Sequence, residues 1–408
     1  MSAHGARVAR AATLLALCAP ALTACGGTTA RQAAAPSPYA PAREPASSGA
    51  RDYYVSRTGD DRHDGSRGRP WRTLRHAASH AGPGSMVHVA PGHYGGPLDF
   101  RRSGRPGSRI RFVSERRWAA RISAHSTGSL GIVQVAGDYV DLDGFDVSGS
   151  GGDGTVGIVV PGSHVRVMRN RVHDVTVACN GDNGGGGIVA GGGLGGYGNH
   201  DIEVRANLVH DVVGAPTRQC PGVQGIYASV ARVLIANNVV YRNAHDCITS
   251  WHAASRLTVV NNTAIDCPGA GITIGSGGSG ATDRGNVGSV VSNNLVYGNG
   301  QGVVETSDGA HRVAPDNRYL NNLVFHSGSG DLRRGDPPSR GAVVSGTVSS
   351  NPRIMGLDGV YRLKAKSPAI DAGTTTGAPR TDFDGVRRPQ GRGIDIGAFE
   401  WRQPDGGS

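Results

Sequence analysis

One asparagine returns six times in a short apolar phrase, and this repeat constrains the fold more than any other feature of the chain. The repeated asparagines lie 37, 31, 24, 32 and 28 residues apart, so a unit of at least 24 residues carries insertions of variable length. A short unit whose insertions are confined to certain loops is typical of a solenoid. The six positions are Asn170, Asn207, Asn238, Asn262, Asn294 and Asn322.

Each repeat contains three short segments with the alternating apolar pattern of a β-strand. One precedes the asparagine, as at Val165 and Val167, one follows it, as at Val209, and one opens with a small residue and a branched one, as at Gly271-Ile272. Three such strands per turn predict a parallel β-helix of about nine or ten turns. We expect the asparagine to adopt the left-handed backbone conformation at a bend and to bond through its amide to asparagines in neighbouring turns.

Motifs at both ends of the chain support this architecture. Tyr53-Tyr54-Val55-Ser56 and Pro70-Trp71-Arg72-Thr73-Leu74 lie near the start, and Ser367-Pro368-Ala369-Ile370-Asp371 and Asp395-Ile396-Gly397-Ala398-Phe399-Glu400 lie near the end. Together with the asparagine repeat, they resemble the right-handed parallel β-helix superfamily of secreted carbohydrate-active proteins, which includes the pectate lyases. The resemblance covers about residues 52–402. It implies an all-β, single-stranded right-handed parallel β-helix.

The ends of such a coil expose an apolar cross-section and therefore need caps. Residues 51–350 are expected to form the β-helix and residues 351–402 a C-terminal capping segment in which Phe399 and Trp401 close the far end. A short amphipathic helix is expected over the first turn, because four apolar residues share one helical face. These are Leu74, Ala77, Ala78 and Ala81.

The first 50 residues have the layout of an export signal followed by a linker. Arg7 and Arg10 precede an apolar run that is too short to span a membrane, and residues 1–24 therefore indicate a signal peptide. Leu22-Thr23-Ala24-Cys25 resembles a bacterial lipobox, which implies acylation of Cys25. Residues 25–50 predict a flexible tether rich in Ala, Pro and Ser. We expect an exported chain, lipid-anchored to the outer face of the bacterial membrane or secreted.

Four cysteines remain in the mature domain. Cys179 and Cys220 occupy the same loop position in consecutive turns, and Cys247 and Cys267 nearly do so. Four cysteines allow three disulfide pairings, and we expect the one that joins Cys179 to Cys220 and Cys247 to Cys267. A zinc site is the alternative, which the lack of a Cys-x-x-Cys pair disfavours.

The net charge of +10 favours an acidic partner. A polyuronate or another cell-wall glycan fits a basic surface, as do anionic lipid headgroups. No nucleic-acid-binding module is recognisable in the sequence, so no nucleic-acid partner is expected. We expect a monomer.

Long loops flank one of the three strands in the repeat. Residues 175–186 and 212–224 precede the Gly-Ile strand, and residues 191–200, 275–288 and 306–317 follow it. Long loops in a solenoid are usually functional. The outer face of this strand is therefore expected to be a walled groove, and the resemblance implies a saccharide groove on the same face.

Residues 244–252 carry the densest set of ionisable and aromatic side chains on that face. A histidine beside an aspartate offers an oriented base, and aromatic rings offer a surface for sugars. The alternative is structural, with the His-Asp pair closing a turn and Trp251 covering the edge of the core. The catalytic candidates are His245, Asp246, His252 and Glu305, and the substrate-binding candidates are Tyr227, Trp251, Arg218, Arg242 and Asp308.

Elimination from a polyuronate needs a positive group on the substrate carboxylate and a base for the adjacent proton. Arginine or bound Ca²⁺ could neutralise the carboxylate. Relatives commonly use lysine or arginine as the base, but the coil contains no lysine, so His245, His252 or Tyr227 would serve. Hydrolysis would need two carboxylates in one column, for which Asp246 and Glu305 are candidates.

We therefore expect extracellular binding and lyase-type cleavage of an acidic polysaccharide. A non-catalytic glycan or cell-wall binder and a glycoside hydrolase are the alternatives. A second His-Asp pattern, at His173-Asp174 and His210-Asp211, recurs at one position of the repeat, which favours a stacked structural turn.

Overall fold

A computed structural model describes residues 51–403 apart from a few short loop segments. The segments outside the description are residues 127–130, 180–183, 193–195, 282–284, 312, 314–315, 329–331, 334–341 and 358–359. The expected signal peptide, Cys25 and the tether also lie outside the described residues. Within the described part of the chain, no helix is long and apolar enough to cross a membrane.

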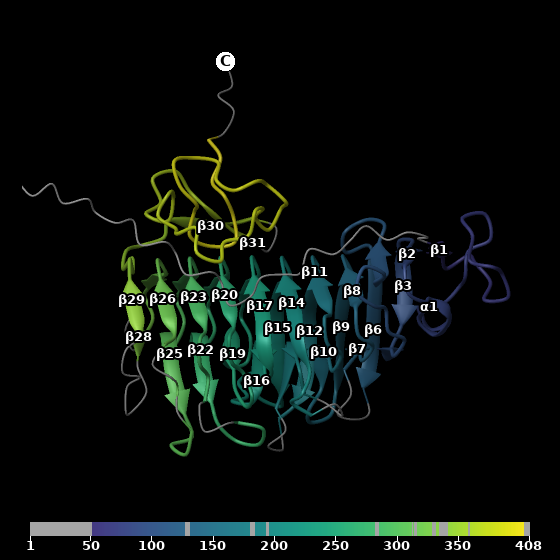
Figure 1. Ribbon diagram of the computed structural model, residues 1–408, viewed down its shortest axis with the longest axis horizontal. Helices are drawn as coiled ribbons and strands as arrows, with labels where there is room; N and C mark the ends of the chain where they lie inside the picture. The colour runs from purple at the N-terminus through teal and green to yellow at the C-terminus, as the bar shows by residue number, and fades with distance from the viewer. Residues whose placement is uncertain are drawn as a thin grey trace, which may run out of the picture. The chain divides into compact units, whose positions relative to one another are not determined.

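Three parallel sheets run along a coil, and each complete turn contributes one strand to each sheet (Figure 1). Among the described residues, sheet 1 has eleven strands, most of which lie just before the repeated asparagines, and sheets 2 and 3 have nine strands each. This matches the expected number of turns. Sheet 1 contains β1 (Arg51–Val55), β2 (Ser85–Val89), β5 (Ile110–Ser114), β8 (Val140–Asp143), β11 (Arg166–Met168), β14 (His200–Arg205), β17 (Ala231–Ala236), β20 (Thr258–Val260), β23 (Val290–Ser292), β26 (Arg318–Leu320) and β29 (Val343–Ser345).

Sheet 2 follows the asparagines, and sheet 3 contains the Gly-Ile strands. Sheet 2 contains β3 (Gly92–Gly95), β6 (Ala120–Ser126), β9 (Asp146–Gly151), β12 (Arg171–Ala178), β15 (Leu208–Ala215), β18 (Val239–Tyr241), β21 (Thr263–Ile265), β24 (Leu295–Tyr297) and β27 (Leu323–Phe325). Sheet 3 contains β4 (Leu98–Phe100), β7 (Val133–Val135), β10 (Val156–Val160), β13 (Gly185–Ala190), β16 (Val223–Ala228), β19 (Ile248–Ser250), β22 (Ala270–Ser276), β25 (Gln301–Ser307) and β28 (Leu332–Arg333). A separate antiparallel hairpin contains β30 (Ile354–Leu357) and β31 (Val360–Leu363).

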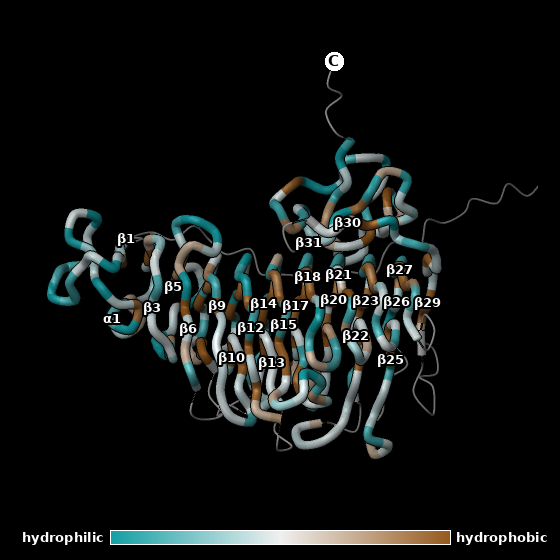
Figure 2. Tube along the Cα trace, turned by 180° about the vertical axis from the view of Figure 1, so that it is seen from behind, coloured by the Kyte–Doolittle hydropathy of each residue, from teal (hydrophilic) through white to brown (hydrophobic). Residues whose placement is uncertain are grey.

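The core is a set of columns of branched side chains inside the coil. In sheet 1, Val167 pairs with Val204, which pairs with Ile235, which pairs with Val259. All four are at most 1% exposed. Each buried aliphatic side chain of this kind contributes about 1.5–3 kcal/mol relative to an exposed one. Figure 2 shows the apolar segments recurring from turn to turn.

The six repeated asparagines form the expected ladder. Each is buried, and the backbone N–H of one donates to the Oδ1 of the next at 2.9–3.0 Å. The side-chain Nδ2 donates to the same Oδ1 at 2.9–3.2 Å. Because these groups are buried, their mutual bonds avoid a large desolvation cost.

The prediction that the ladder asparagines themselves adopt the left-handed conformation is wrong, because that conformation occurs one residue earlier. The positive φ angles, between 51° and 56°, belong to the residue before each of them. That residue makes the bend, and the ladder amide can then point into the coil. Four of these six preceding residues are also asparagine, which tolerates this conformation well. They are Asn237, Asn261, Asn293 and Asn321.

Replacing Asn262 by alanine is expected to lower the free energy of unfolding by about 2–4 kcal/mol, since two buried backbone groups lose their partners. The Asn238 N–H and the Ile235 carbonyl both bond to the Asn262 amide, at 2.9 and 2.8 Å. Chemical denaturation measures the loss. The exposed Asn351→Ala variant is the control, and an equal effect of both substitutions would contradict the ladder's role.

Both expected disulfides are present. Cys179 is bonded to Cys220 with a Cα–Cα distance of 5.9 Å, and Cys247 is bonded to Cys267 with one of 5.7 Å. Each joins neighbouring turns near the bend between sheets 2 and 3. The alternative of a cysteine zinc site is therefore wrong.

The expected N-terminal helix is α1 (Leu74–His80). Thr73 caps it by accepting a hydrogen bond from the backbone N–H of His76 at 3.1 Å. Its apolar face is buried, and the helix packs against β4 in the first turn. The helix thus supplies the apolar cover that the first turn requires.

The C-terminal segment packs on the outer flank of sheet 2. Phe399 belongs to a buried cluster with Phe383 and with outward residues of β15, β18, β24 and β27. The left-handed Asn261 and Asn293 donate to the carbonyls of Gly397 and Thr374 at 3.1 and 2.7 Å. The expectation that Phe399 and Trp401 close the far end of the coil is therefore wrong, because this segment lies along its side.

Candidate active site

The outer face of sheet 3 is defined by the strand register. Ile226, Ile248 and Ile272 follow one another in consecutive turns and are buried in the coil. The neighbouring row, Tyr227-Thr249-Thr273, has the opposite orientation and lies on the outside. This is the face that the long loops were expected to border.

His245 and Asp246 lie on this face just before β19, which begins at Ile248. Asp246 is only 6% exposed, and both of its oxygens are used. Oδ2 accepts hydrogen bonds from the hydroxyls of Thr249 and Thr273 at 2.8 and 2.7 Å, and Oδ1 accepts one from the Ala270 N–H at 2.7 Å. The carboxylate is therefore held rigidly between its own turn and the next.

The Asp246 carboxylate orients the imidazole of His245. Nδ1 of His245 lies 3.0 Å from Asp246 Oδ1, an ion-pair contact whose angle departs from that of a hydrogen bond. The His245 side chain remains 40% exposed. This arrangement leaves Nε2 of the same ring to meet a ligand.

The two groups shift each other's pKa values in opposite directions. Burial opposes the charged form of Asp246, but His245 and the hydrogen bonds from Thr273 and Ala270 hold the pKa of its carboxyl below the usual range. The contact with Asp246 raises the pKa of His245 above its ordinary value, despite partial burial. The pair is thus an aspartate that stays ionised beside a histidine of increased basicity.

A second group of candidates gathers at the other end of the same strands. Trp251 lies on the backbone of the next turn, since a Cβ added to Gly275 or Gly277 would approach its ring to 2.3 or 2.6 Å. Asp308 accepts a hydrogen bond from the Gly278 N–H at 2.8 Å and lies 2.9 Å from His311 Nδ1. These contacts, led by the Gly278 bond, hold the pKa of Asp308 well below its usual range.

Tyr197 completes this aromatic group and was missed in the sequence. Its ring stacks on His252 at 4.6 Å, and its hydroxyl lies 3.1 Å from the Ser279 hydroxyl. Tyr227 meets the same His252 ring edge-on at 6.2 Å. The signal was present as a lone aromatic residue in a long glycine-rich loop. Burial raises the pKa of Tyr227 and lowers that of His252, so Tyr227 stays a neutral phenol near pH 7.

Three candidates do not lie on this face itself: two arginines lie at its border, and a glutamate lies inside the coil. Arg218 and Arg242 both contact Asp211, at 3.4 and 2.5 Å, and line a groove of about 740 Å³ at the bend between sheets 2 and 3. Glu305 is 1% exposed and accepts a hydrogen bond from the Tyr319 hydroxyl at 2.6 Å inside the coil. The expected column of Asp246 and Glu305 is therefore wrong, because Glu305 pairs with the inward Ile274.

The recurrent His-Asp pairs form the expected structural stack. His173 and His210 occupy one register of β12 and β15, and their rings stack at 5.3 Å. Each also lies 2.8 Å from the aspartate that follows it. Tyr241 continues the column in the next turn at 4.9 Å.

Comparison with known proteins identifies relatives of this fold. Residues 123–324 match the family model of the right handed beta helix region, and residues 57–98 match a family of unknown function, DUF1565. An uncharacterized protein, YwoF of Bacillus subtilis (strain 168), is 30% identical over 139 residues, which is 31% of this chain and 30% of that protein. The match thus spans about a third of that relative's length.

Two of the solved structures to which the chain is similar are polysaccharide lyases. Pectate lyase Pel9A superimposes with a TM-score of 0.55 at 17% identity, over 88% of this chain and 98% of that one. An alginate lyase from Paenibacillus sp. str. FPU-7 gives a TM-score of 0.43 at 16% identity, over 68% and 92%. At these identities, the Pel9A match shows a shared fold.

Proposed function

Because the chain belongs to the right-handed parallel β-helix superfamily, we propose that it binds an acidic polysaccharide on the outer face of sheet 3 and cleaves it by β-elimination. The observation that carries the proposal is the His245–Asp246 pair, an exposed imidazole oriented by a rigidly held carboxylate. The net charge of +10 supports an acidic substrate. Pectate lyase Pel9A acts as a precedent for lyase chemistry on this fold.

In the proposed reaction, His245 Nε2 removes the proton from the carbon next to a uronate carboxyl group. The electron pair of that C–H bond forms a carbon–carbon double bond, and the bond to the glycosidic oxygen breaks. The departing sugar oxygen takes a proton from water. Asp246 holds the ring in place and stabilises the imidazolium that forms.

The substrate carboxylate needs a positive group nearby, and Arg218 is our candidate. Its side chain is 70% exposed on the loop before β16, where it could turn from Asp211 to a ligand. Ca²⁺ prefers oxygen ligands. Within the described residues, the only group of three histidine, cysteine or carboxylate side chains close enough to share a metal ion contains two histidines. We also propose that the protein acts outside the cell, anchored through Cys25.

The aromatic group favours a second function, glycan binding without turnover. Tyr197, Tyr227, Trp251 and His252 gather on this face, whereas strands β16, β19, β22 and β25 contain no lysine or arginine. An experiment with immobilised polyuronates and glycosaminoglycans would distinguish the two functions. It would follow the retention of the protein and the ultraviolet absorbance of released unsaturated uronate together. Product formation supports the lyase, and retention that Trp251→Ala weakens, without product, supports the binder.

The pH dependence of product formation tests the role of Asp246. A base must be neutral to accept a proton, so the rate is expected to rise with pH through the raised pKa of His245. Asp246→Asn removes the negative charge that raises this pKa. The acidic limb of the profile should then move to lower pH, and the maximal rate should fall. Asp174→Asn, beside His173, is the matched control; an unmoved limb in Asp246→Asn would contradict the assignment.

A further inference from the structure

A separate group of ionisable side chains lies on the bend between sheets 3 and 1. His164 precedes β11, and His200 and Asp201 open β14 in the next turn. One ligand atom from each residue lies within 4.8 Å of the others. The proposed reaction uses none of these three side chains.

The backbone of the coil fixes this arrangement. The His164 N–H donates to the His200 carbonyl at 3.0 Å, and the strand register that follows places His164 opposite Asp201 in the neighbouring turn. His164 and Asp201 both have left-handed backbone angles, with φ of 57° and 59°. The bend thus presents the three side chains together as a consequence of the solenoid register.

One oxygen of Asp201 faces both imidazoles. His200 Nδ1 lies 2.8 Å from Asp201 Oδ2, and His164 Nδ1 lies 3.7 Å from the same oxygen. The two rings are nearly perpendicular, at 87°, with centroids 5.3 Å apart. Tyr139 stacks on His164 at 4.4 Å and limits the rotation of its ring.

These distances suit a tetrahedral metal ion. Zn²⁺ binds histidine nitrogen and carboxylate oxygen at about 2.0–2.2 Å, which places neighbouring ligand atoms about 3.4 Å apart. The observed 2.8 and 3.7 Å lie on either side of that value. We propose that His164, His200 and Asp201 bind a divalent transition metal of the Zn²⁺ type. The side chains are 24–37% exposed, which leaves room for water as a fourth ligand.

Arg232 supports the carboxylate from its other side. Its Nε donates to Asp201 Oδ1 at 2.7 Å, and its Nη2 donates to Oδ2 at 3.0 Å. With metal bound, the Nε bond would orient the ligand as outer partners of metal sites commonly do. The Nη2 contact is the interaction that metal binding would weaken.

The proposed metal lies at the base of a loop that reaches the candidate active site. His200 follows three residues after Tyr197, whose ring stacks on His252. Metal binding would therefore fix the end of the loop that carries this aromatic surface. The metal site itself stands on the geometry of its three ligands and does not depend on lyase activity.

Titration calorimetry on untagged, chelator-treated full-length protein with Zn²⁺ tests the proposal. We expect one equivalent to bind, and His164→Gln to weaken its affinity at least about tenfold. His173→Gln is the matched control. The His173 stack resembles the proposed metal site, since His210 contacts Asp211 at 2.8 Å and Arg242 forms an ion pair with the same aspartate. Its side chains do not form a group of three potential metal ligands.

Co²⁺ absorption provides a second readout, since tetrahedral nitrogen and oxygen ligands give intense visible bands. These bands should appear in the native protein and disappear in Asp201→Asn. This second variant tests the site if His164→Gln does not fold. Metal-free melting curves check the folding of each variant. Absence of Zn²⁺ binding, or binding that folded His164→Gln or Asp201→Asn leaves unchanged, would overturn the proposal.

Discussion

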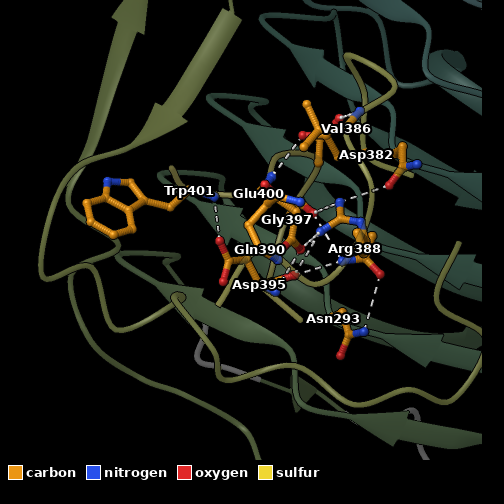
Figure 3. A network of polar contacts seen from close by, with 12 residues as sticks. Asn293, Asp382, Val386, Arg388, Gln390, Asp395, Gly397, Glu400 and Trp401 are labelled. Atoms are coloured by element: carbon orange, nitrogen blue, oxygen red, sulfur yellow. Dashed lines mark hydrogen bonds and ion pairs between the residues drawn. The ribbon is translucent and has the colours of Figure 1, made fainter. Parts of the chain in front are cut away.

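Replacing Arg388 by alanine is expected to destabilise the C-terminal segment by about 3–5 kcal/mol, because it leaves a buried carboxylate without its partner. Nη1 of Arg388 contacts Glu400 Oε1 at 2.5 Å, and the two side chains are 1% and 0% exposed (Figure 3). Its Nη2 donates to Asn237 Oδ1 at 3.0 Å and to the Gly397 carbonyl at 2.9 Å. One guanidinium therefore connects the segment to the bend between sheets 1 and 2.

Limited proteolysis and denaturant unfolding would measure this effect. Cleavage after residue 350 should accelerate in Arg388→Ala while the coil itself stays protected. Arg362→Ala is the control within the same segment, since its ion pair with Asp384 is partly exposed at 2.7 Å and contributes at most about 1 kcal/mol. Equal protection of the segment in both variants would show that the buried pair does not hold it in place.

The coil was predictable from the sequence because its signals repeat. The asparagine ladder and the β-branched columns appear in turn after turn, and each repetition strengthens the inference. The disulfides followed from the same repeat, since residues at one position of neighbouring turns must lie close together. The N-terminal helix was predictable from the spacing of four apolar residues.

The side-on packing of the C-terminal segment was missed, although the sequence contains a signal for it. After the repeated asparagines come two consecutive apolar residues, as in Leu208-Val209 and Leu295-Val296. A strand with one exposed face would alternate, whereas this pattern indicates burial on both faces. The inner residue of each pair fills the coil, and the outer one contacts the C-terminal segment.

The candidate site was predictable only in part, because the Gly-Ile strands do not alternate strictly. Cys247 and Ile248 are both buried in the core, so Asp246 and Thr249 lie outside together. In Val303-Val304-Glu305, either valine could face inward on the sequence alone. The prediction put Glu305 on the outer face, whereas Val303 and Glu305 both face the inside of the coil. The pairing of Arg218 and Arg242 with Asp211 depends on loop geometry, which no short motif encodes.

The second large effect expected is on catalysis. His245→Ala should lower the rate of polysaccharide cleavage by about 10²–10⁴, the usual contribution of a positioned base. Stability should change little, because the His245 side chain is 40% exposed and its Nδ1 makes only the contact with Asp246. His173→Ala is the control, since it removes a histidine beside an aspartate on a different face of the coil.

The most direct measurement follows ultraviolet absorbance during incubation of the protein with polyuronates and glycosaminoglycans, with and without calcium. The native protein and His173→Ala should both produce unsaturated uronate from at least one substrate, and His245→Ala should lose nearly all of this activity. Product formed at the native rate by folded His245→Ala, or no product from the native protein on any of these glycans, would contradict the assignment of an elimination reaction to this face.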